Sequence, residues 1–107
     1  TEQIDLIQIA REALSNISRH AKAKNVEIQL AYEDGDKYIV MSIIDDGVGM
    51  SGSVDKTQHH GLIIMKERAH NIGGEFIVTD NQPQGTIVTV RFAPNFFNEK
   101  NTQDAYL

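Results

Sequence analysis

The chain has 107 residues, enough for one hydrophobic core and too few for two domains. Cysteine is absent, which excludes both a disulfide framework and a thiolate zinc site. The net charge is −5 and the lysines and arginines are scattered, so we expect no nucleic-acid partner, because that function needs a concentrated basic face.

The sequence opens without a methionine, directly in a helical pattern, and contains no signal-peptide or membrane-span pattern. We interpret it as a piece of a longer protein. Residues 1–93 are expected to form one domain, and residues 94–107, which are rich in asparagine, glutamine and charge, a flexible C-terminal tail.

The first expected element is a helix over residues 2–20. Its apolar positions recur at steps of three and four and predict one buried stripe made of Leu6, Ile7, Ala10, Ala13, Leu14 and Ile17. Glu12, Asn16 and His20 are spaced four residues apart, so they share a different face of the same helix.

Two strands follow, over residues 25–33 and 37–45, joined by a hairpin turn at Asp34-Gly35-Asp36. The first strand alternates apolar and polar residues and is expected to be half-buried. The second is apolar on both faces and is expected to be central in the sheet. Asp45 ends it in phase with Met41 and Ile43, so its carboxylate should lie on their face.

The second half repeats this order. Residues 50–60 are polar and without period, which indicates a mobile loop, and a helix is predicted over residues 62–72, with Leu62, Met65, Ala69 and Ile72 inward. Strands are predicted over residues 75–79 and 86–92, joined by a turn at 80–85. The sequence therefore predicts an α+β fold, a two-layer α/β sandwich with the helices on one face of a mixed sheet.

The segment Asp45-Asp46-Gly47-Val48-Gly49 is the first candidate for chemistry. A carboxylate at a strand end can accept a hydrogen bond from an exocyclic amine, and glycines let a backbone pass close to a flat ring or adopt positive φ. The alternative is a strand that leads into an ordinary flexible turn.

Glu12, Asn16 and His20 are the second candidate. An amide oxygen is a hard ligand for Mg²⁺, a carboxylate can orient a water or take a proton, and an imidazole can donate to a phosphate oxygen. The alternative is a solvated helix face.

Two smaller motifs complete the candidates. Gly61-Leu62 is interpreted as a hinge at a helix N-terminus with N–H groups accessible to phosphate, or else as a flexible start of the helix. Gly85-Thr86 supplies a small hydroxyl at the start of the last strand, or else forms an ordinary turn. His59 and His60 are adjacent and cannot easily share one zinc ion.

Taken together, these motifs resemble the GHKL superfamily, and more closely the ATP-binding catalytic domain of bacterial sensor histidine kinases, which has the GHKL/Bergerat ATP-binding fold. The resemblance covers Gln8 to Phe92. The segments REALSNISRHAKAKNVEIQL and HHGLIIMKERAHNIGGEF are similar to the short-lid branch, and nearest to nitrate/nitrite sensor kinases of the NarX/NarQ type.

The resemblance implies ATP and Mg²⁺ as cofactors and gives each candidate a role. Asn16 would bind Mg²⁺, Glu12 would be the catalytic, polarising carboxylate near the γ-phosphate, and His20 would contact phosphate oxygens. Gly61 and Leu62 would hinge the lid and offer amides to the phosphates.

On the adenine side, the resemblance implies that Asp45 accepts from the N6 amine. Gly47 and Gly49 would let the backbone pass the ring, and Gly85-Thr86 would complete the adenine pocket.

The resemblance also implies a protein-histidine kinase activity directed at a separate dimerisation and phosphoacceptor domain of the parent chain, with a LuxR-type response regulator downstream. The parent would be a homodimeric inner-membrane sensor and this piece a cytoplasmic domain, monomeric by itself. The separate phenylalanine-bearing lid motif of larger kinases is missing. A GHKL serine kinase of the anti-sigma-factor type and a catalytically silent GHKL interaction module are the alternatives.

Overall fold

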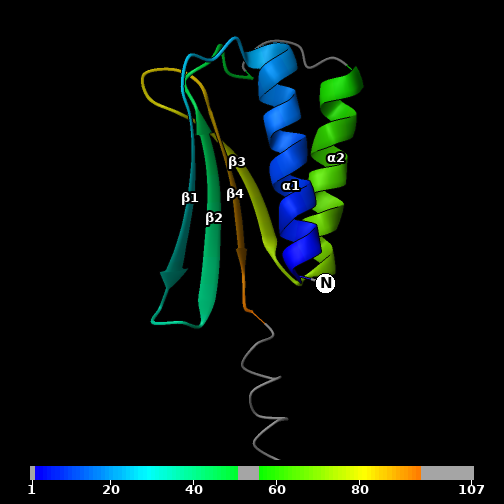
Figure 1. Ribbon diagram of the computed structural model, residues 1–107, viewed down its shortest axis with the longest axis vertical. Helices are drawn as coiled ribbons and strands as arrows, with labels where there is room; N and C mark the ends of the chain where they lie inside the picture. Colours follow the sequence, from blue (N-terminus) through cyan, green and yellow to red (C-terminus); the bar gives the residue numbers. More distant parts are fainter. Residues whose placement is uncertain (1, 51–55, 95–107) are drawn as a thin grey trace, which may run out of the picture.

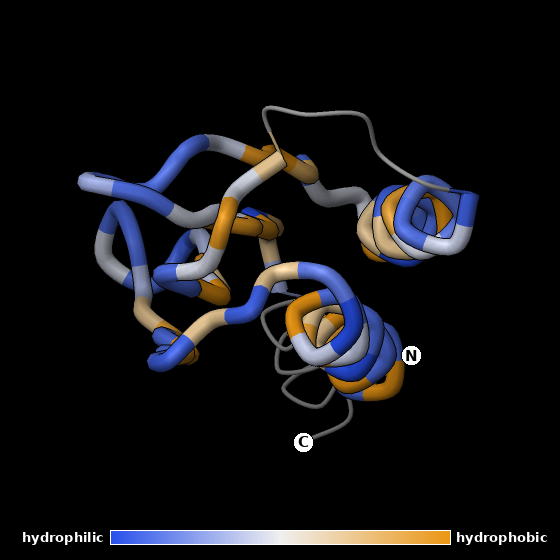
Figure 2. The backbone as a smooth tube through the Cα atoms, turned by 90° about the horizontal axis from the view of Figure 1, so that it is seen from above, coloured by the Kyte–Doolittle hydropathy of each residue, from blue (hydrophilic) through white to orange (hydrophobic). Residues whose placement is uncertain are grey.

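The computed structural model describes residues 2–50 and 56–94, which form two layers (Figure 1). Its elements in chain order are α1 (Glu2–Asn16), the π-helix η1 (Ile17–Ala21), β1 (Val26–Glu33), β2 (Tyr38–Asp45), α2 (Lys56–Asn71), β3 (Glu75–Asp80) and β4 (Thr86–Phe92). Figure 2 shows α1 and α2 on the same side of the sheet. In this part of the chain no helix is long and apolar enough to cross a membrane.

The four strands pair in the order β1-β2-β4-β3, and each of the three pairings is antiparallel. The predicted α+β class and the central place of β2 are confirmed, but the prediction of a mixed sheet is wrong for the described strands. The reason lies in the connections. β1 and β2 form a hairpin, β3 and β4 form another, and α2 returns the chain so that β4 pairs with β2.

The core lies between the helices and the two central strands. Its buried members come from both helices, β2 and β4, and are Ile9, Ala13, Met41, Ile43, Met65, Ala69, Val88, Val90 and Phe92. The predicted stripe of α2 is confirmed, since Met65 and Ala69 are buried and Leu62 and Ile72 pack against the core.

The predicted stripe of the first helix is partly wrong. Ile7 and Leu14 are 58% and 40% exposed, whereas Ile9, which the pattern left out, is buried. The physical reason is that α1 packs against α2 as well as the sheet, which turns its buried side toward α2. Ile7 lies nine residues before Asn16 and thus about half a turn away around the helix, so it falls on the side remote from α2.

β1 is exposed along its whole length, so the prediction of a half-buried strand is also wrong. Its apolar residues alternate as expected and share a face with buried residues of β2, for example Ile28 with its cross-strand partner Ile43. However, β1 contributes no residue to the core, which is built from α1, α2, β2 and β4. Alternation identified the strand and its face, but which strands the helices cover is a tertiary property.

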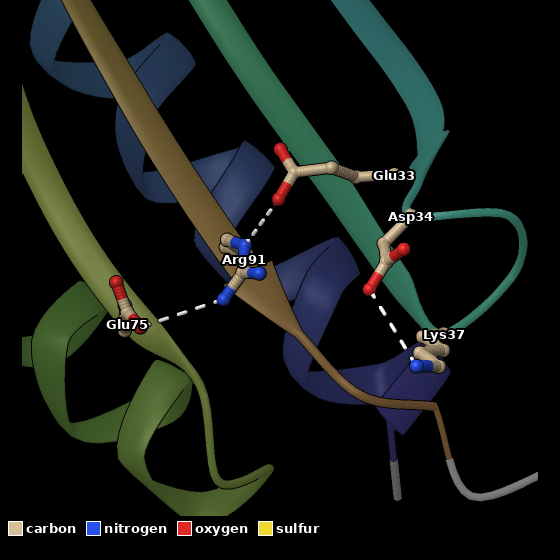
Figure 3. Close-up of polar contacts among 5 residues, drawn as sticks. All are labelled: Glu33, Asp34, Lys37, Glu75 and Arg91. Atoms are coloured by element: carbon tan, nitrogen blue, oxygen red, sulfur yellow. Dashed lines mark hydrogen bonds and ion pairs between the residues drawn. The ribbon is translucent and has the colours of Figure 1, made fainter.

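The other face of the sheet carries a polar network at the end where β2 begins (Figure 3). Nε of Arg91 donates to Oε1 of Glu33 at 2.6 Å, and Nη1 lies 3.6 Å from Oε1 of Glu75. The guanidinium carbon is 3.6 Å from the centroid of the Tyr38 ring. The hydrogen bond with Glu33 is the largest cause that raises the pKa of Arg91. Arg91 thus links four strands through exposed contacts.

The helix boundaries differ from the sequence prediction. The first helix changes to a π-helical turn after Asn16, and the second begins at Lys56 instead of residue 62, so residues 56–60 are helical and not part of a loop. Residues 51–55 and 95–107, which contain the rest of the predicted loop and most of the predicted tail, lie outside the described residues.

Candidate nucleotide-binding site

A pocket opens between the two helices and the end of the sheet where β2 stops. It is lined by Ala13, Asn16, Ile17, Ala21, Gly49, Met50, Gln58, Leu62, Met65, Thr86 and Val88. Four of the predicted site residues are therefore in its wall: Asn16 from α1, Gly49 from the loop after β2, Leu62 from α2 and Thr86 from β4. The other six lie around it.

Asp45 is placed beside the pocket by the register of the central strands. Its side chain is only 4% exposed and lies on the inner face, and its cross-strand partner is Thr86, which lines the pocket. Oδ1 of Asp45 accepts a hydrogen bond from the backbone N–H of Gly47 at 2.8 Å. Burying a carboxyl group is costly unless it is hydrogen-bonded, and this bond gives one of its oxygens a partner at the pocket end of β2.

Glu12 and Asn16 are half-buried on the side of α1 that meets α2. Their neighbour is Gly61: a Cβ added there would lie 3.0 Å from Oδ1 of Asn16 and 3.2 Å from Oε2 of Glu12. The missing side chain lets α2 approach the polar pair closely. Glu12 and Asn16 therefore sit where the two helices meet and not on a solvated face.

The predicted position of Gly61 is wrong. It lies inside α2, buried, five residues after the helix begins at Lys56, and Leu62 follows it in the same helix. Neither residue is therefore a hinge or lies at a helix N-terminus. The polar residues before it misled the prediction, because they suggested a loop where they form the first turns of a helix. The glycine is explained by close helix packing instead.

Three glycines of the predicted site are required by the chain itself. A Cβ on Gly47 would lie 2.2 Å from the carbonyl oxygen of Ala21, and one on Gly85 would lie 1.9 Å from that of Asp45. Gly49 and Gly85 also have positive φ, +78° and +111°. These glycines let three segments approach one another closely: the end of η1, the loop after β2 and the start of β4.

His20 lies in η1, half-buried, and is not in the wall of the pocket. The prediction assumed a continuous α-helix, in which residues four apart align on one face. In a π-helical turn each hydrogen bond spans one more residue than in an α-helix, so His20 no longer aligns with Glu12 and Asn16 on one face. Lys22 then ends the turn in the left-handed conformation, with φ of 52°.

The sequence prediction missed a set of polar residues that fix the backbone here. Nδ2 of Asn81 donates to the carbonyl of Asp45, and Nε2 of Gln84 to the carbonyl of Asp46, each at 2.9 Å. The carboxylate of Asp46 accepts from Lys24 and Asn25, and these bonds, foremost the one from the Asn25 backbone, lower the pKa of Asp46 below its usual value of 3.8. Only the adjacency of Asp46 to Asp45 could have drawn attention to it.

These features define the class of protein: an α+β domain with a ligand site between a helical layer and the end of an antiparallel sheet. Residues 1–95 match the family of histidine kinase-, DNA gyrase B- and HSP90-like ATPases. The chain belongs to this family and is an ATPase domain homologous to those of sensor histidine kinases.

Its similar proteins include two nitrate/nitrite sensors of Escherichia coli K12. The chain is 37% identical to the nitrate/nitrite sensor protein NarX over 93 residues, which is 87% of this chain and 15% of the relative. It is 33% identical to NarQ over 90 residues, 84% of this chain and 16% of the relative. Sensor histidine kinase LiaS of Bacillus subtilis is 36% identical over 99 residues, 92% of this chain and 27% of the relative. The chain thus spans well under a third of these relatives.

Solved structures share the fold. The Acinetobacter baumannii histidine kinase AdeS superimposes with a TM-score of 0.69 at 20% identity, over 85% of this chain and 46% of that one. Full-length ShkA, solved in complex with AMPPNP, gives a TM-score of 0.69 at 23% identity, over 84% of this chain and 21% of that one.

Proposed function

We propose that this domain binds Mg-ATP at the pocket and transfers the γ-phosphoryl group to a histidine on a separate dimerisation and phosphoacceptor domain of its parent protein. One observation carries the proposal: Asn16 and Thr86 line the same pocket, and Thr86 is the direct cross-strand partner of the buried Asp45. This supports the proposal, because the residue proposed to bind the metal comes from the helical layer, the residue proposed to accept from the purine comes from the sheet, and both lie at one pocket.

On the purine side, the Asp45 carboxylate accepts from the adenine N6 amine. Its Oδ1 is held in place by the Gly47 N–H, so its direction is preset before the ligand arrives. Thr86 offers a hydroxyl in the pocket wall, and Gly85 and Gly49 keep the adjoining backbone close. Gly47 has no side chain, which lets the Ala21 backbone approach closely, so Gly47 affects the site through the position of η1.

On the phosphate side, Asn16 supplies the oxygen ligand for Mg²⁺. Because Mg²⁺ is usually held by one or two protein oxygens together with substrate phosphates, one amide oxygen in the pocket wall fits this role. Bound Mg²⁺ would neutralise phosphate charge. Glu12 lies beside Asn16 at Gly61. In this proposal Glu12 polarises the attacking group, and His20 contributes a donor from η1.

The reaction is a displacement at phosphorus. A nitrogen of the acceptor imidazole forms a bond to the γ-phosphorus while the bond to the β–γ bridging oxygen breaks and ADP leaves. Catalysis in such transfers comes mainly from positioning and from charge stabilisation. Leu62, an apolar member of the wall, helps to exclude water from the site.

The parent is proposed to be a homodimeric inner-membrane sensor, with this domain in the cytoplasm and a LuxR-type response regulator as its downstream partner. The 33–37% identity to the NarQ and NarX sensors makes nitrate or nitrite one candidate stimulus of the parent. The 36% identity to LiaS is of the same size, so identity within this domain does not select the stimulus.

Calorimetry and a transfer assay test the proposal. The wild-type domain is expected to bind Mg-ATP. Asp45→Asn should weaken binding at least about tenfold, and both Asp45→Asn and Asn16→Asp should abolish transfer to a supplied phosphoacceptor domain. Asp34→Asn, at an exposed turn residue, is the matched control. An acid-labile product indicates phosphohistidine, and an acid-stable product would assign the domain to the serine kinases. Retained transfer in both site variants would refute these roles.

A further inference from the structure

Three segments that carry the proposed site meet at one acidic residue that the site itself does not use. These are the linker after η1, the loop that contains Gly47 and Gly49, and the turn before Gly85. Asp46 itself belongs to the glycine loop. Its carboxylate contacts the linker after η1, and its backbone carbonyl contacts the turn before Gly85.

The carboxylate contacts are specific in geometry. Oδ1 accepts from the backbone N–H groups of Lys24 and Asn25 at 2.8 and 2.9 Å, and Oδ2 accepts from Nδ2 of Asn25 at 2.9 Å. The backbone N–H of Asp46 donates in return to the carbonyl of Asn25 at 3.3 Å. Hydrogen bonds to a charged acceptor are the stronger kind. Three of the four bonds go to the carboxylate of Asp46, and three of the four join Asp46 to Asn25.

The pair also sets the position of η1. Asn25 lies four residues after Ala21, the last residue of η1, and Val48 lies two residues after Asp46. Between these points the N–H of Val48 donates to the carbonyl of Ala21 at 2.7 Å, and Gly47 packs against the same carbonyl. Clamping Asn25 to Asp46 therefore holds the end of η1 against the glycine loop, with His20 one residue away.

We propose that Asp46 and Asn25 form a positioning pair that fixes η1 and the glycine loop at the separation the nucleotide requires. Neither residue lines the pocket, so both act through the backbone they hold. This inference rests on the proposed function as regards ATP, but the backbone arrangement it describes can be measured without nucleotide.

A charge-swap experiment tests the pair. In Asn25→Asp two carboxylates face each other, and Mg-ATP affinity is expected to fall at least about tenfold. Asp46→Asn loses the charge but lets the Asn25 amide turn its oxygen toward the new NH₂ group, so a loss of about threefold is expected. The double variant Asn25→Asp/Asp46→Asn restores a carboxylate–amide pair with the roles exchanged and should return to within about threefold of the wild type.

The second readout is hydrogen exchange at the Val48 amide, measured by NMR without nucleotide. Protection should be lost in Asn25→Asp and regained in the double variant, while Asp34→Asn leaves it unchanged. A double variant no better than Asn25→Asp in protection, or wild-type protection in Asn25→Asp, would overturn the positioning role. A wild-type protein that fails to bind Mg-ATP would instead overturn the proposed function, and the exchange data would still decide the role of the pair.

Discussion

The two ends of the sheet are held together by different kinds of contact. Where β2 stops, most side-chain hydrogen bonds go to backbone groups of other segments: Asn81 and Gln84 bond to carbonyls, and Asp46 to N–H groups as well as to the Asn25 side chain. Where β2 begins, side chains bond to side chains, as Arg91 does with Glu33 and Glu75. Contacts to backbone fix where the chain runs, whereas exposed ion pairs are screened by water and salt. The end that carries the proposed site is thus the end whose backbone is fixed.

The largest expected effect is that of Gly85→Ala at the site end. Its Cβ would lie 1.9 Å from the carbonyl oxygen of Asp45 at a φ of +111°, so the backbone at the ends of β2 and β4 must move apart. We expect the free energy of unfolding to fall by at least about 3 kcal/mol, as is found for backbone strain combined with overpacking. Chemical denaturation followed by circular dichroism measures it.

Gly35→Ala is the matched control for this loss. Gly35 also has positive φ, +71°, but a Cβ there meets no atom within 4 Å, so only the conformational cost of about 1–2 kcal/mol applies. If Gly85→Ala and Gly35→Ala lowered the free energy of unfolding equally, the clash with the Asp45 carbonyl could not be the cause of the loss at Gly85.

A smaller and different effect is expected for Gly61→Ala. Alanine is favoured over glycine in a helix interior by roughly 1 kcal/mol, so stability should be kept or slightly raised. The new Cβ would nevertheless press on Asn16 and Glu12, whose side-chain atoms lie 3.0–3.2 Å away, and Mg-ATP affinity should fall about threefold to tenfold. Parallel thermal melts and calorimetry measure the two quantities. Unchanged affinity would mean that Gly61 serves packing alone.

The smallest effect is expected at the other end of the sheet. Arg91→Ala removes two exposed ion pairs and the contact with the Tyr38 ring, and should lower Tm by no more than about 3 °C, less still in high salt. Lys37→Ala, which loses only a 3.7 Å pair with Asp34 in a turn, should leave Tm within about 1 °C. If Arg91→Ala proved as costly as Gly85→Ala, the contrast between the two ends would fail.

The sequence predicted the elements better than it predicted their burial. Each predicted helix and strand is present, because hydrophobic period and turn residues are local properties. Ile7 and Leu14 were placed in the core because periodicity does not say which side of a helix meets a second helix. The second helix begins at Lys56, before the predicted start next to Gly61, because a polar first turn of a helix and a loop have similar composition.

The sequence alone determined the membership of the family and the residue types at the site, since the carboxylate, the amide and the glycines stand in a characteristic order. Only the tertiary structure decided how they meet. The β2–β4 register sets Asp45 beside Thr86, the missing side chain of Gly61 brings α2 onto Glu12 and Asn16, and Asp46 ties the linker after η1 to the glycine loop. Such meetings depend on contacts between residues far apart in the chain, and no local pattern encodes their distances.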